Sequence, residues 1–221
     1  MRIIVSEEIR KLCPSFKGAA IYAQVKNSAY SQPLWDEIQV TSAAFCEHFT
    51  TESIKTFSPI QATRQAYRNC GKDPSRYRPS GESLIRRILQ GKPLYQIDTL
   101  VDLINLASIK GGYSIGGFDA DKVQGETLTL GIGKAGEPYE GIGRGLLNIE
   151  GLPVYRDALG GIGTPTSDHE RTKMNIKTTH LLALVNGYDG DDIRIRGTAE
   201  HIQCLIRTYA ESDGETIWMY E

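Results

Sequence analysis

The 221-residue sequence predicts an α+β fold in which helices and strands are largely segregated along the chain. Two observations support this prediction. Segments with helical spacing and helix-capping residues dominate the chain up to about residue 110. Beyond that point glycine becomes frequent, and short apolar segments alternate with turns, which is typical of β-strands. A parallel α/β fold would instead alternate helices and strands throughout.

The ends of the expected helices before residue 75 are marked by capping residues. Ser6 is followed by two glutamates, which favour the start of a short helix, and Ser58-Pro59 can begin another. The helices expected here are 6–14, 33–49 and 58–71. Between the first two, residues 18–25 form an apolar run that predicts a buried strand.

Two further helices are expected at 80–91 and 97–109. Ser80 can cap the first, whose apolar face contains Leu84, Ile85, Ile88 and Leu89. Arg86 and Arg87 fall outside that face, so we expect them to reach solvent or a ligand. The second helix is apolar on most sides and is expected to be buried.

The remaining elements are mostly strands. Strands are expected within 114–121, 126–133, 146–158 and 180–188, and a last one at 216–220. Residues 197–211 have helical spacing again. Because no repeat or linker divides the chain, we expect one domain over 1–221, with a helical N-terminal part at 1–75 and the remainder at 76–221.

Composition excludes several classes of protein. The chain is 40% hydrophobic and 24% charged, which is ordinary for a globular protein. No apolar run approaches the ~18 residues that cross a bilayer, and residues 1–12 do not resemble a secretion signal. We therefore expect a cytoplasmic protein without a membrane partner. The four cysteines lie far apart, so we expect reduced thiols, no metal and no cofactor.

Charge is distributed unevenly. Residues 64–92 contain eight lysines and arginines and two acidic residues, a window of +6, whereas the net charge of the whole chain is −2, so the rest carries −8. Such asymmetry can mark a surface that faces a phosphate backbone. The alternative interpretation is a solvated helical surface.

Familiar catalytic motifs are not supported. Residues 131–136 match the letters G-x-G-x-x-G, but Glu137-Pro138 follows where a dinucleotide-binding motif needs a helix. His169 lies in a polar loop that could line a site, although no partner residue is evident from the sequence.

An ordered set of motifs over residues 80–164 resembles the B3/B4 domain of the phenylalanyl-tRNA synthetase β-subunit. The matching positions are Ser80, Arg86-Arg87, Ile97, Val101-Asp102, Asn105, Phe118-Asp119, Asp121-Lys122, Gly125 and Glu137, followed by Tyr155-Arg156-Asp157 and the glycine-rich run 160–164. The resemblance implies a layered α+β domain with an unusual β-sandwich. It also implies a tRNA or aminoacyl-tRNA partner and a metal-free pocket for an aminoacyl group, where the synthetase domain hydrolyses mischarged tyrosyl-tRNA.

The resemblance and the side-chain chemistry together give the candidate site residues. Asn105 offers a donor and an acceptor from an apolar helix, and glycines allow a ligand to approach the backbone closely. The expected substrate-binding residues are Asn105, Gly116, Gly160, Gly161 and Gly163, and the candidates for catalysis are Asn105 and Thr164. The expected RNA-binding residues are Arg78, Arg86 and Arg87.

Three positions depart from the family pattern. The family's threonine, histidine and glutamate fall at Ile104, at Gly116 and near Ala183. Without that glutamate we do not expect recognition of a tyrosine hydroxyl, and no ATP site suggests an aminoacylating ligase. Three hypotheses stay open: a deacylase of some mischarged tRNA, a non-catalytic RNA-binding module, and a small-molecule binder.

Overall fold

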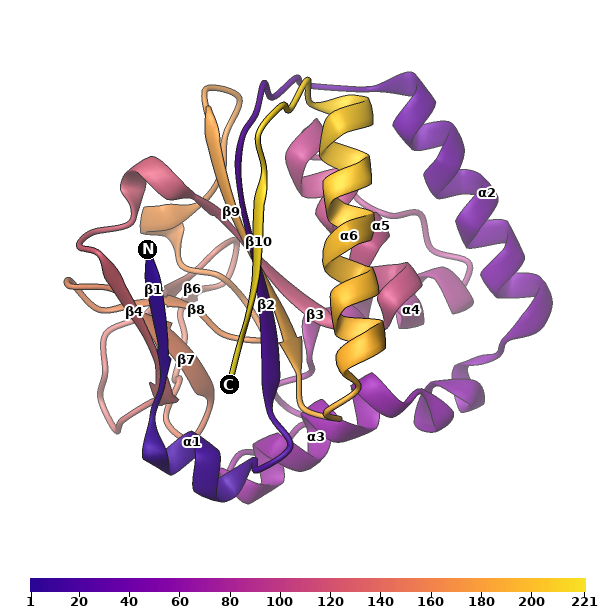
Figure 1. Ribbon diagram of the computed structural model, residues 1–221. Helices are drawn as coiled ribbons and strands as arrows, with labels where there is room; N and C mark the ends of the chain where they lie inside the picture. Colours follow the sequence, from indigo (N-terminus) through magenta and orange to yellow (C-terminus); the bar gives the residue numbers. More distant parts are fainter.

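Two four-stranded β-sheets and a layer of helices form the body of the molecule (Figure 1). The computed structural model describes residues 1–221. The first sheet has the order β1 (Arg2–Val5), β4 (Thr127–Ile132), β7 (Pro153–Arg156), β8 (Gly161–Gly163). The second has the order β10 (Thr216–Tyr220), β2 (Lys17–Gln24), β9 (His180–Gly187), β3 (Ser114–Asp119). All neighbours are antiparallel except β1 and β4.

The two sheets pack face to face because side chains on β2 and β9 alternate between two cores. Ala20, Leu182 and Leu184 point toward the first sheet and join a core with Leu130 and Phe118. The residues between them point the other way, into a core shared with helices: Ala19, Ile21, Leu181, Ala183 and Val185. The second sheet is therefore buried on both faces, and the layered α+β fold with a β-sandwich is confirmed.

Helices cover the outer face of the second sheet (Figure 1). They are α2 (Gln32–His48), α5 (Thr99–Gly111) and α6 (Asp192–Tyr209). Next to them α4 (Ser80–Leu89) packs on α5 through Ile85, Ile88 and Ile109. The helices α1 (Glu7–Leu12) and α3 (Ser58–Asn69) lie at one end of the sheets.

Short elements complete the chain. The 3-10 turns are η1 (Thr51–Thr56), η2 (Ala120–Lys122) and η3 (Glu170–Thr172), and a small hairpin consists of β5 (Glu140–Gly141) and β6 (Gly145–Leu146). None of the helices combines the length and the apolar character that crossing a bilayer requires.

Several elements differ from the sequence-based expectation, among them the short strands β5 and β8, which were not expected. The strand β1 was not expected, because only four residues separate the N-terminus from the cap of α1. The helix α6 begins at Asp192, five residues early, because Asp191 caps it through a side-chain hydrogen bond to the Arg194 amide. The intervening alternation Ile193-Arg194-Ile195 is more typical of a strand, and its first isoleucine is exposed. The N-terminal 75 residues also contribute β2, which is paired on both sides by later strands.

Candidate functional site

A pocket of about 380 Å³ opens beside Asn105, between α4, α5, β3 and the segment 164–174. Aliphatic side chains form most of its wall: Leu84, Ile97, Val101, Ile104, Ile115, Ile142 and Met174. The other lining residues are Ser80, Asn105, Ser108, Gly117, Thr164, Asp168 and Lys173. The pocket is thus apolar with a few polar groups, as small-molecule sites usually are.

Asn105 reaches this pocket from the exposed side of an otherwise buried helix. Asp98 caps α5 by accepting a hydrogen bond from the Val101 amide, and Leu103 and Leu106 fix the buried face in the core. The Asn105 side-chain amide makes no hydrogen bond to any other protein group, whereas the Ser108 hydroxyl is already bonded to the Tyr113 carbonyl. Asn105 therefore keeps both its donors and its acceptor for a ligand.

Asp168 is the single carboxylate in the pocket wall. Its Oδ2 accepts a hydrogen bond of 3.0 Å from the Gly117 amide, and no lysine or arginine forms an ion pair with it. Burial raises the pKa of Asp168 to about 7, although the Gly117 hydrogen bond acts in the opposite direction. The pocket thus contains a carboxyl group with no charged partner in the protein.

The glycines Gly116 and Gly163 make space for that carboxyl group. A Cβ atom on Gly163 would lie 2.9 Å from Asp168 Oδ1 and 2.5 Å from Cζ of Phe118, and a Cβ atom on Gly116 would lie 2.7 Å from the same ring carbon. These two predicted residues therefore lie behind the pocket wall. Their lack of side chains leaves room for Phe118 and Asp168.

The rest of the glycine-rich run lies further from the pocket. Gly160 has a φ of 148°, donates its amide hydrogen to Asp157 and forms a turn, and Gly161 packs against the Tyr139 ring. Thr164 does line the pocket. Its hydroxyl donates to the Ser167 carbonyl and accepts hydrogen bonds from the amides of Thr166 and Ser167, so it is fully engaged in its own turn.

A second hollow of about 350 Å³ adjoins the pocket and shares Ser80, Leu84 and Asn105 with it. We call it the basic groove. Its lining contains no carboxylate and five cationic side chains: Arg78, Arg86, Arg87, Lys92 and Arg144. Neither Lys92 nor Arg144 forms an ion pair or a side-chain hydrogen bond. The groove also holds Tyr95, which is 68% exposed and lies 3.9 Å beneath the Arg87 guanidinium.

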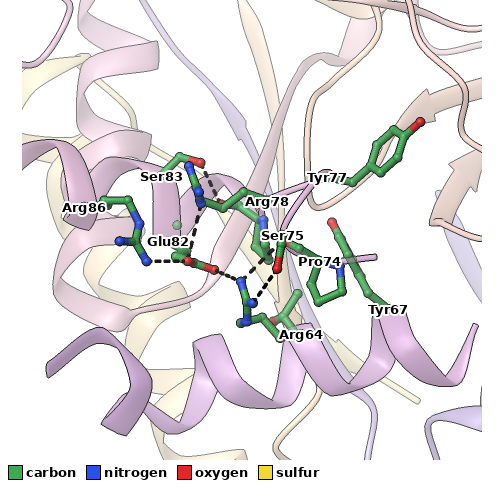
Figure 2. Close-up of polar contacts among 12 residues, drawn as sticks. Arg64, Tyr67, Pro74, Ser75, Tyr77, Arg78, Glu82, Ser83 and Arg86 are labelled. Carbon is green, nitrogen blue, oxygen red and sulfur yellow. Dashed lines mark hydrogen bonds and ion pairs between the residues drawn. The ribbon is translucent and has the colours of Figure 1, made fainter. Parts of the chain in front are cut away.

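A buried carboxylate holds two of the groove arginines in place (Figure 2). Glu82, only 1% exposed, lies in the first turn of α4, where the helix dipole favours a negative charge. It accepts hydrogen bonds of 2.9 Å from Arg64 and from Arg86, and Arg78 Nε lies 3.5 Å from Oε1. Three guanidinium groups therefore surround one carboxylate, which leaves a net positive charge at the end of the groove.

The structure brings together part of the predicted site. Asn105 and Thr164 line the pocket, and all three predicted RNA-binding arginines line the groove. The sequence-based reasoning missed Asp168, although it directly precedes the loop histidine that was considered. His169 itself accepts a hydrogen bond from the Arg171 amide and packs edge-on against Tyr139, outside the pocket wall.

The missed groove residues had no signal in the sequence. Tyr95 lies just beyond the end of the basic window 64–92, and Arg144 comes from a segment far from it in the sequence. Of the three departures from the family pattern, Ile104 lines the pocket, Gly116 lies behind Asp168, and Ala183 is buried in the helix-facing core.

Comparison with known proteins identifies the family. The sequence profile of the B3/4 domain matches residues 62–213, so the chain belongs to the B3/4 domain family, which confirms the resemblance found in the sequence. No curated protein sequence matches the chain.

Solved structures similar to this chain include a fragment of a synthetase subunit. It is an N-terminal fragment of the phenylalanyl-tRNA synthetase β-subunit from Pyrococcus horikoshii, with 13% identity and a TM-score of 0.48. The superposition covers 98% of this chain and 50% of that one, so the present chain spans about half the length of the fragment.

Proposed function

We propose that this chain binds tRNA through the basic groove and receives the aminoacyl group of an aminoacyl-tRNA in the adjoining pocket. One observation carries the proposal: a carboxylate-free groove with five cations meets an apolar pocket at Asn105. A linear anion that ends in a small, partly apolar group fits this arrangement. An aminoacylated RNA end has that chemistry.

The groove suits a single-stranded phosphate backbone. Arginine and lysine side chains bind phosphates by neutralising charge and releasing counterions. Tyr95 is exposed and offers a flat face on which an unpaired base can stack, worth about 1–3 kcal/mol in single-strand binders. The Arg87 guanidinium, stacked on the other side of that ring, adds a cation for the neighbouring phosphate.

The pocket suits an aliphatic amino acid rather than tyrosine. Its wall is formed by branched aliphatic side chains, and Ala183 lies in the core instead of supplying a carboxylate for a phenolic hydroxyl. At the position of the family's glutamate, the site therefore gives a hydroxylated side chain no advantage over an aliphatic one.

Hydrolysis of a mischarged aminoacyl-tRNA is the second candidate, and the unpaired amide of Asn105 favours it. In that reaction a water oxygen attacks the ester carbonyl carbon, and the ribose oxygen leaves with a proton. The Asn105 N–H groups could donate to the carbonyl oxygen as negative charge develops there. Incubation with a panel of misacylated tRNAs tests this candidate; ester loss no faster than in buffer on every member would contradict it.

Filter binding of uncharged tRNA over a range of salt concentrations tests the main proposal. The variant Arg87→Ala/Arg144→Ala removes two groove cations. We expect binding at low salt, and a slope of log K against log salt that falls by about 1.5 in this variant. The control Lys26→Ala/Arg207→Ala removes two exposed cations that pair with Glu211 and Glu215 outside the groove.

The control should leave the slope unchanged. Absence of binding at low salt, or equal slopes in both double variants, would contradict the RNA proposal. Binding of an amino acid without any binding of tRNA would favour a small-molecule binder instead.

A further inference from the structure

The carboxyl group of Asp168 has one oxygen occupied and one free. Oδ2 accepts the Gly117 amide hydrogen, and Oδ1 has no hydrogen-bond donor in the protein. Gly116 and Gly163 flank Oδ1 from behind and, having no side chains, bring no donor to it, while Asp168 itself lines the pocket. A carboxylate in this setting lacks the partner that buried charges normally have.

None of the surrounding titratable groups supplies that partner. Lys173 also lines the pocket, but its ammonium pairs with Glu170. The Tyr139 hydroxyl donates to the Ser167 carbonyl, and His169 Nδ1 accepts from the Arg171 amide. The part of β3 beside Asp168 consists of glycines and Phe118, and the one charged residue of the strand, Asp119, pairs with Lys122.

We propose that Asp168 is the counter-ion for an ammonium group of the ligand, so that the pocket selects an amino acid with a free α-amino group. This inference rests on the proposed function and adds to it a specificity-determining residue. An ammonium within hydrogen-bond reach of Oδ1 would pair with the ionised carboxylate. The aliphatic wall would then contact the side chain of the same amino acid. An Nα-acylated ligand presents a neutral amide there and leaves the carboxylate unpaired.

The experiment compares two stable analogues of an aminoacylated RNA end. The first is 3′-deoxy-3′-(L-leucylamino)adenosine, and the second is its Nα-acetyl derivative. Binding of each to the full chain is measured by calorimetry at pH 7.5 and at pH 5.5. The same measurements are made on Asp168→Asn, which keeps an oxygen to accept the Gly117 hydrogen bond, and on His169→Gln as the control for the neighbouring titratable group.

At pH 7.5 we expect the free amine to bind roughly tenfold more tightly than the acetylated analogue, and Asp168→Asn to remove that preference. The wild-type affinity for the free amine should fall roughly tenfold at pH 5.5, because protonation of the carboxyl group removes its charge while the ligand stays an ammonium. Affinity for the acetylated analogue should not fall at pH 5.5, because protonation removes the unpaired charge that this ligand leaves, and His169→Gln should behave as the wild type does.

Equal affinities for the two analogues in the wild type, or a preference that survives in Asp168→Asn, would overturn the inference. If the variant does not fold, the pH dependence of the wild type decides alone, and equal affinities at both pH values would overturn it. Failure of both analogues to bind would also overturn it. Binding of uncharged tRNA by the same preparation then shows whether the groove proposal fails with it.

Discussion

The two carboxylates beside the candidate site have opposite surroundings. Glu82, under the basic groove, is contacted by three arginines, two of which bond it at 2.9 Å. Asp168, in the wall of the pocket, has one backbone amide and no cation. Both lie in the same small region of the protein. The protein brings more positive charge to Glu82 than is needed to neutralise it, and it brings none to Asp168.

The charge of Glu82 is balanced within the protein and serves the fold, whereas the charge of Asp168 is left for a ligand to balance. At Glu82 the protein brings three positive charges to one negative charge, so the excess is positive and is directed at the groove. At Asp168 the excess is negative and is directed at the pocket. The charges of the site are therefore complementary to those of an aminoacyl-tRNA end. The positive groove suits the phosphates, and the negative pocket suits the ammonium.

The largest effect is expected from removing the charge of Glu82. Glu82→Gln leaves three guanidinium groups close together without a carboxylate, and we expect it to lower the free energy of unfolding by about 3 kcal/mol. Urea denaturation measures this change. The matched control Glu47→Gln alters an exposed glutamate that makes no ion pair, and it should change stability by less than about 0.5 kcal/mol. A loss at Glu82 no larger than at Glu47 would mean that the cluster does not stabilise the fold.

A smaller loss is expected when the space behind Asp168 is filled. In Gly163→Ala the new Cβ atom would overlap the Phe118 ring and approach Oδ1 of Asp168, so we expect a loss of about 2 kcal/mol and weaker ligand binding. The control Gly197→Ala lies in α6 with no atom within 4 Å of the added Cβ. Because alanine favours a helix over glycine, this control should stabilise by up to about 1 kcal/mol. Thermal unfolding measures the change in stability for each variant. Equal changes in Gly163→Ala and Gly197→Ala would contradict this prediction.

The uncompensated charge of Asp168 should cost stability at high pH. Its pKa is raised in the folded chain to about 7, whereas an unfolded aspartate has a pKa near 3.9, so folding favours the protonated form. Wild-type stability should therefore decline as pH rises from about 4 through 7. Asp168→Asn cannot ionise, so it should be more stable than wild type at pH 8, by at most about 4 kcal/mol, and equally stable near pH 4. A variant that is less stable at pH 8 would show that the charge is balanced within the protein.

The layers of the fold were predictable, but the groups that complete the site were only partly so. Alternation of apolar residues and helix caps identified most elements, and helical spacing alone indicated that Arg86 and Arg87 leave the apolar face of α4. Asp168 and Glu82 were not predictable, since a carboxylate in a polar loop and one in a first helical turn are ordinary surface features. Their burial depends on contacts with Gly117, Arg64 and Arg78, which the tertiary fold alone brings close.

The central claim is that groove and pocket bind one continuous ligand, and Asn105 lies where they meet. Asn105→Ala should not change stability by more than about 0.5 kcal/mol, because its side chain makes no hydrogen bond within the protein. Asn69→Ala is the opposite control: it loses a hydrogen bond to the Leu12 carbonyl, about 1 kcal/mol of stability, and no ligand contact.

The most direct measurement compares the affinities of uncharged tRNA and tRNA carrying a leucyl group in a stable amide linkage. The account predicts that the charged form binds wild type and Asn69→Ala about tenfold more tightly, and that Asn105→Ala loses most of this difference while retaining its affinity for uncharged tRNA. Equal binding of charged and uncharged tRNA by the wild type would contradict it.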